Sequence, residues 1–177
     1  VYMPKGDGSH YVDAIITKDG EGVGSLSGTY RAEGNGELDA TLDMNHFPLS
    51  YINGFVPEQI VGLEGVGEGS LTLKGPLKNL DINGEVYLDS TYLVSAPYGI
   101  RMRFADDPVT IRNSHIEFEN FEMFASNGSP LDISGSLDFS SLDNMRLDAR
   151  MQAKNFQVIN ARKNPRSEVY GNAFVDF

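Results

Sequence analysis

The chain contains no cysteine and no tryptophan among its 177 residues. Without cysteine it has neither a disulfide framework nor a thiolate that could act as a nucleophile or a metal ligand. Basic residues are also scarce, since 14 Lys and Arg stand against 25 Asp and Glu and leave a formal net charge of -11. Because an acidic chain repels the phosphate backbone, we expect no nucleic-acid partner.

Long apolar runs are missing as well. No stretch approaches the roughly 18 consecutive apolar residues that a membrane-spanning helix needs, and no signal peptide opens the chain. Residues 169–177 have the pattern of a strand that continues to the last residue. We therefore expect an internal segment of a longer protein, with any membrane anchor or targeting signal outside it.

Apolar and polar residues alternate along most of the chain. Residues 38–44, for example, read Leu-Asp-Ala-Thr-Leu-Asp-Met. The same period of two recurs in residues 71–74, 80–88, 100–104, 109–111, 116–118, 131–139 and 147–153. Successive side chains of a strand point to opposite faces, so this pattern predicts an all-β fold, mostly antiparallel, with one apolar face and one solvated face.

One segment departs from this period. Leu49, Ile52 and Val56 have helical spacing, Pro48 suits a first helical turn, and Pro57 would end the helix. The sequence therefore predicts a single short helix near residues 48–55.

Two parts of the chain resemble each other. Residues 38–47 (LDATLDMNHF) match residues 147–156 (LDARMQAKNF), and a Ser-Gly pair precedes each, at 27–28 and 134–135. Self-similarity at a nearly fixed offset is typical of repeat architectures. We expect residues 1–177 to form one segment with about one and a half copies of a repeat of ~107–109 residues, in which 134–156 echo 27–47.

Residues suited to catalysis are not grouped in the sequence. His10, His46 and His115 are isolated from one another, and no second ligand stands at metal-binding spacing. The carboxylates lie mostly at the polar positions of strands, where a solvated face explains them. We predict no enzymatic activity, no catalytic residues, no metal and no cofactor.

The order of these features resembles the TamB and AsmA-like family. The resemblance rests on residues 67–86 (GEGSLTLKGPLKNLDINGEV), on the Phe-Pro-Leu at 47–49, and on residues 109–118 and 131–139. Members repeat a Gly-x-Leu-x-Leu-x-Gly pattern, a turn with proline, and a strand with a central glycine. Each motif is short, and it is their succession over nearly the whole chain that carries the resemblance.

The resemblance implies an elongated, curled sheet with an apolar interior groove, in a periplasmic segment of a protein anchored in the inner membrane of Gram-negative bacteria. It implies phospholipid transport between the membranes, with acyl chains as ligands, and a partner among outer-membrane barrel proteins of the TamA/BamA type. The residues expected to line the groove are Leu71, Leu73, Ile82, Val86, Leu88, Ile100, Met102, Phe104, Ile111, Ile116, Phe118, Ile133, Leu137, Phe139, Leu147 and Met151.

Three alternatives remain open at this stage. The first is a scaffold whose free strand edges pair with client strands during outer-membrane protein assembly. The second is a carbohydrate-binding or enzymatic β-sandwich, for which Tyr92, Tyr98 and Phe124 are candidate contacts. The third is that the apolar faces simply close on each other as an ordinary core.

Overall fold

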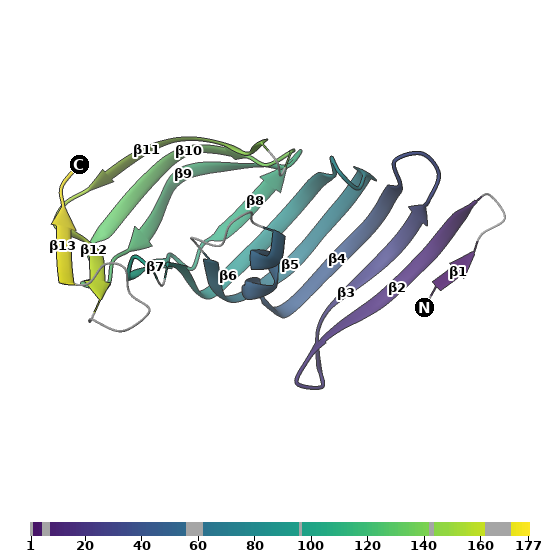
Figure 1. Cartoon of the computed structure of the whole chain (residues 1–177), viewed down its shortest axis with the longest axis horizontal. Coiled ribbons are helices and arrows are strands. Elements are labelled where there is room, and N and C mark those ends of the chain that lie inside the picture. The colour runs from purple at the N-terminus through teal and green to yellow at the C-terminus, as the bar shows by residue number, and fades with distance from the viewer. Residues whose placement is uncertain (1, 5–7, 56–61, 96, 142–143, 162–170) are drawn as a thin grey trace.

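The computed structural model describes residues 2–4, 8–55, 62–95, 97–141, 144–161 and 171–177. Within this part, an 11-stranded sheet, a separate two-stranded sheet and a short 3₁₀ helix make up the regular structure. The large sheet is curled without closing into a barrel (Figure 1). The predicted all-β, mostly antiparallel fold with one short helix is confirmed.

The strands are long in the first half of the chain and shorter in the second. Their bounds are β1 Tyr2–Pro4, β2 Ser9–Lys18, β3 Glu21–Arg31, β4 Glu37–Pro48, β5 Gly62–Pro76, β6 Asp81–Ser95, β7 Ile100–Phe104, β8 Pro108–Arg112, β9 His115–Phe124, β10 Pro130–Asp138, β11 Arg146–Ala153, β12 Phe156–Ala161 and β13 Gly171–Val175. The helix, η1, covers Leu49–Phe55. Of the strand predicted over residues 169–177, residues 169 and 170 lie outside the described part.

Consecutive strands are neighbours from β1 to β6, as expected when short turns join antiparallel strands. The order then becomes irregular, because β7 and β8 both lie between β6 and β9. The link from Ala105 to Asp107, followed by Pro108, divides what would be one strand into these two shorter ones. The order ends with β9, β10 and β11.

The strand register places apolar residues on one face and polar residues on the other. Leu42 of β4 lies opposite Leu26 of β3 and Leu71 of β5. The next residue, Asp43, lies opposite Ser25 and Ser70 on the other side of the sheet. We call the two sides the inner face, which carries Leu42, and the outer face, which carries Asp43.

The inner face is the inside of the curl. The larger core cluster contains Phe121 and Met123 of β9 and Ile133 of β10, together with Phe156 of β12. Half-buried side chains of β6, β7 and β8 pack against this cluster on the same face. In Figure 1, β9 to β11 arch back over this side, and β12 and β13 lie at the same end.

The predicted helix near residues 48–55 appears as the 3₁₀ helix η1. The helix lies between β4 and β5, which pair with each other from Pro48 and Val66 onward. Its first residue, Leu49, is buried, and Gly67 of β5 provides the space for the Leu49 side chain. Val56, the last residue of the predicted spacing, lies outside the described residues.

The two halves of the sequence echo occupy comparable hairpins. Gly28 of β3 lies opposite Ala40 of β4, and Gly135 of β10 lies opposite Ala149 of β11. In both hairpins a side chain on the glycine would overlap the backbone of the facing strand. The repeat itself stays a prediction.

Candidate functional site

The predicted groove-lining residues lie on the inner face wherever the strand register defines their position. One row across the sheet joins Ile111, Ile116, Leu137 and Leu147 from β8 to β11. Another places Leu73 beside Ile82. Phe139 follows the end of β10, and its backbone N–H donates to the carbonyl oxygen of Ser114 at 3.0 Å.

These side chains differ in how far they are covered. Val86 and Ile133 are buried, whereas Leu147 and Met151 are 59% and 41% exposed. The others are half-buried: Leu71, Leu73, Ile82, Leu88, Ile100, Met102, Phe104, Ile111, Ile116, Phe118, Leu137 and Phe139. The inner face is thus neither sealed as a complete core nor fully open to solvent.

The region around β12 is the most completely covered part of the inner face. Phe156 is only 1% exposed and belongs to the larger core cluster with Met123 and Leu131. None of these three residues is among the predicted lining set. The sequence gives one indication that Phe156 is buried, because this residue follows soon after the alternating run of β11. Nothing in that pattern shows that the chain then packs against the inner face of the sheet.

A recess of about 840 Å³ opens where β8 and β9 separate. These strands pair only through Ile111 with Ile116 and Arg112 with His115, so β9 leaves β8 after its first residues. The recess is lined by apolar inner-face residues such as Ile116, Phe118 and Phe121 and by charged residues such as Arg112 and Glu117. The large sheet therefore has an opening between β8 and β9 at this position.

The distortion at this recess has a local cause in β9. Asn120 has a φ of 53°, a left-handed conformation that asparagine tolerates better than most residues. The pairing of β9 with β10 shifts register at the same place, between Ile133 and Gly135. In the sequence, the only sign of this bulge is that Glu119 and Asn120 are two consecutive polar residues between Phe118 and Phe121.

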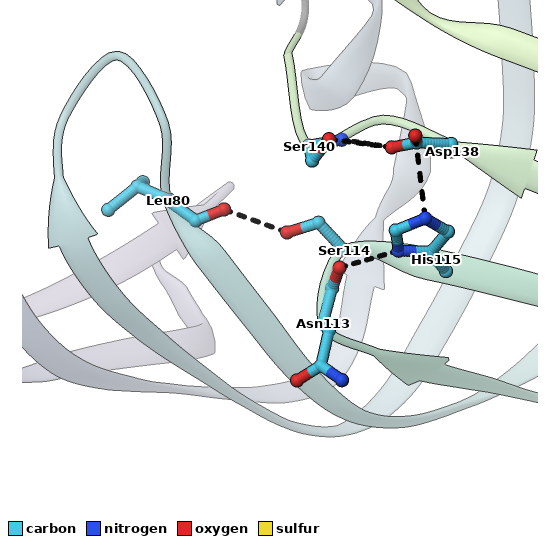
Figure 2. Close-up of polar contacts among 6 residues, drawn as sticks. All are labelled: Leu80, Asn113, Ser114, His115, Asp138 and Ser140. Atoms are coloured by element: carbon cyan, nitrogen blue, oxygen red, sulfur yellow. Dashed lines mark hydrogen bonds and ion pairs between the residues drawn. The ribbon is translucent and has the colours of Figure 1, made fainter.

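Ser114, His115 and Asp138 come close together at one end of the sheet, but not as a catalytic triad (Figure 2). The Ser114 hydroxyl donates to the carbonyl oxygen of Leu80 at 2.7 Å and accepts the N–H of Ile82 at 3.0 Å. Figure 2 shows this hydroxyl pointing toward Leu80 and away from the His115 ring. Ser114 is therefore a buried structural link between the β8–β9 turn and the start of β6.

His115 and Asp138 form the rest of this cluster. The imidazole Nδ1 lies 2.7 Å from the carbonyl oxygen of Asn113, and Nε2 lies 3.4 Å from Asp138 Oδ2. The Ser140 hydroxyl and backbone N–H, both donating to Asp138 Oδ1, hold the pKa of that carboxyl below its ordinary value, with smaller help from His115 and Arg146. The polar groups of His115, Asp138 and Ser140 thus contact one another and the neighbouring backbone, which matches a role in stabilising the turn.

Two of the three aromatic residues considered for sugar binding have an arginine stacked on the ring. The guanidinium of Arg101 lies 3.9 Å from the Tyr92 ring centre, and that of Arg103 lies 4.8 Å from the Phe124 ring centre. Tyr98 stands apart in the turn before β7 and is 38% exposed. Tyr92 and Phe124 lie in one row across β6, β7 and β9, on either side of Arg103.

The described residues contain no group of three His, Asp or Glu side chains that could hold a metal ion. Within the same part of the chain, no helix is long and apolar enough to span a membrane.

No family model, curated protein or solved structure matches this chain. The resemblance to TamB and AsmA-like proteins therefore rests on the sequence motifs described above.

Proposed function

We propose that this chain is a segment of a TamB/AsmA-like periplasmic protein whose inner face holds the acyl chains of phospholipids on their way between the inner and outer membranes. It acts without catalysis, as part of a longer protein anchored in the inner membrane. The observation that carries the proposal is the combination of a continuous apolar face, left half-exposed on most of its length, with a polar opposite face.

The contrast between the two faces supports a role for the inner face beyond folding. A sheet whose sole purpose was a stable core would be expected to cover its large apolar side chains. Here Leu71, Leu73 and Ile82 remain half-buried in the middle of the sheet, and Leu147 and Met151 are exposed at its last strand. An apolar face that stays partly accessible is a typical site for apolar ligands or partners.

The energetic scale suits an acyl chain. Each methylene removed from water contributes about 0.8 kcal/mol, so a tail that buries ten of them gains about 8 kcal/mol. Because this gain comes from area and not from directional bonds, a row of aliphatic side chains from β4 to β11 can hold a tail at many positions. That property suits movement along the sheet better than tight binding at one point.

Site-specific photo-crosslinking tests the proposal in the full-length protein in cells. A photo-reactive residue at Ile82 or Phe118, both on the inner face, is expected to capture phospholipid. The matched controls are Asp81 and Glu117, each one residue away on the outer face. Equal capture at inner and outer positions, or none at either inner position, would refute the lipid-holding role.

The alternative role, a strand scaffold for outer-membrane protein assembly with a barrel partner, stays a prediction. It requires a strand edge that is free to pair with a client strand.

A further inference from the structure

The hairpin of β12 and β13 differs from the rest of the fold in how it is attached. Within the described residues, these two strands pair with each other and form a small sheet apart from the large one. A two-stranded hairpin is marginally stable by itself in water, so it needs an apolar surface to pack on. In Figure 1 the hairpin lies at the end of the curl where β9 to β11 arch back.

One face of this hairpin packs on the inner face of the large sheet. Phe156 of β12 lies opposite Val175 of β13. Phe156 belongs to the larger core cluster, and Val158 and Val175 pack against that cluster. Phe174, which comes directly before Val175 and therefore points to the other face, is 52% exposed. The hairpin is thus anchored to the large sheet through one apolar face.

The surface under the hairpin is a part of the same inner face that stays half-exposed elsewhere. Phe121 and Met123 of β9 and Leu131 and Ile133 of β10 cluster with Phe156 and are between 5% and 8% exposed. Most inner-face residues in the middle of the sheet are half-buried. The apolar side chains of the hairpin therefore occupy a place that an acyl chain could occupy on the rest of the inner face.

Both ends of the hairpin are tied to the large sheet at one place. Ala153, the last residue of β11, and Phe177 exchange two backbone hydrogen bonds of 2.9 and 3.1 Å. Next to this pair, the backbone N–H of Asn155 donates to the Asp176 carboxylate. Asn155 belongs to the short link between β11 and β12 and has a φ of 50°. The hairpin can therefore turn about this stem as a unit while the bonds of the stem stay in place.

The far end of the hairpin is held less firmly than the stem. The backbone N–H of Asn160, near the end of β12, lies 3.4 Å from the carbonyl oxygen of Gly99, which is long for a hydrogen bond of this kind. A turn about the stem breaks this contact and the packing of Phe156 and Val158, but it leaves both sheets paired. Because local opening of this kind breaks few contacts, it requires less free energy than unfolding of the large sheet.

We propose that the β12–β13 hairpin is a hinged cover that competes with acyl chains for the inner face of β9 and β10. In the closed arrangement Phe156 and Val158 fill this part of the face. When the hairpin turns away, Phe121 and Met123 become accessible to a lipid tail. The nature of the ligand rests on the proposed function, whereas the movement of the hairpin does not. The cover thus regulates how far along the sheet a tail can be held.

Hydrogen exchange of the full-length protein, followed by mass spectrometry, tests the movement without lipid. Because a detached hairpin is only marginally stable, the amides of β12 and β13 should exchange at least about tenfold faster than those of β9 and β10. Val158→Ser weakens the apolar contact and should speed this exchange about fivefold. The control Phe174→Ser changes the exposed face of the same hairpin and should leave the exchange unchanged. Exchange as slow as that of β9 and β10, or equal effects of the two substitutions, contradicts the hinged cover.

Photo-crosslinking in cells tests the competition for lipid in the same protein. A photo-reactive phenylalanine derivative in place of Phe121 should capture phospholipid weakly in the parent chain and about three- to fivefold more strongly with Val158→Ser. Capture at Ile82, in the middle of the sheet, should be the same in both. Capture at Ile82 without an increase at Phe121 overturns the competition and leaves the proposed function intact. Absence of capture at both positions refutes the proposed function and, with it, the competition for lipid.

Discussion

Gly28 in β3 offers a sharp test of how the sheet is packed. A methyl group at this position would overlap the carbonyl oxygen of Asp39 and the Cα and Cβ of Ala40 on the neighbouring strand. These are mostly backbone atoms, which cannot move aside as the tip of a flexible side chain can. Gly28→Ala therefore forces β3 and β4 apart in the middle of a paired stretch.

The matched control is Gly22→Ala in the same strand. A methyl group there would meet only the Ile15 side chain, at 3.8 Å, an ordinary contact. Where the backbone tolerates alanine, removing glycine stabilises a protein by about 0.4–1 kcal/mol through the unfolded state. Gly22→Ala is thus expected to be neutral or slightly stabilising.

Overpacking typically costs about 1–3 kcal/mol, and overlap with backbone places Gly28→Ala at about 3 kcal/mol. For a chain of this size that cost lowers the unfolding midpoint by about 6–12 °C. Thermal unfolding followed by circular dichroism measures both variants against the parent. If Gly28→Ala unfolded at the same temperature as Gly22→Ala, the close approach of β3 and β4 would be wrong.

Two further predictions concern the cluster at the β8–β9 turn. Ser114→Ala removes the hydroxyl that binds the backbone of Leu80 and Ile82 and leaves both backbone groups without this partner. Urea unfolding should therefore show that the free energy of unfolding falls by about 1–3 kcal/mol. An unchanged unfolding midpoint would contradict the structural role of Ser114. Ser140→Ala removes the main cause of the lowered pKa of Asp138, and an NMR titration of the Asp138 carboxyl should show that pKa moving up toward its ordinary value. The pKa of Asp138 in the folded state lies below the unfolded value of about 3.9. The ionised carboxyl of Asp138 therefore stabilises the folded state above that pH, and this stabilisation is lost as the pH falls through the folded-state pKa. Stability should consequently fall less on acidification in Ser140→Ala than in the parent chain, and an identical acid profile would count against this linkage.

The faces of the strands could be predicted from the sequence because alternation is a local property. Residues 38–44 and 80–88 both placed their apolar residues on the face that the structure makes the inside of the curl. The helix was predictable for a similar reason, since proline and the spacing of Leu49 and Ile52 are local features too. Its tighter 3₁₀ form was not, because the spacing of apolar residues does not distinguish a short 3₁₀ helix from an α-helix.

The arrangement beyond neighbouring strands could not be predicted in this way. β7 and β8 share a place between β6 and β9, and the alternation within each short strand does not show which part of β6 or β9 it pairs with. The burial of Phe156 beneath the sheet is a tertiary event of the same kind. Alternation separates two faces, but it contains no information about which part of the apolar face another element covers.

The position of the strand glycines accounts for the curl. Gly24, Gly28, Gly69, Gly84 and Gly135 all lie on the inner face, each opposite an apolar residue or alanine of a neighbouring strand. The concave side of a curved sheet has less room than the convex side, so residues without side chains are best placed there.

Small and large residues also alternate across the strands. One row reads Ile16, Gly24, Met44, Gly69, Val86 and Val109 from β2 to β8. Three of the inner glycines, Gly69, Gly84 and Gly135, have φ near +145°, a conformation that other residues rarely adopt. The space beside these glycines is occupied from the neighbouring strands, by the Phe47 side chain at Gly24 and by the carbonyl oxygen of Glu85 at Gly69. The inner-face glycines therefore let neighbouring strands approach closely on the concave side, and this close approach favours the bend in that direction.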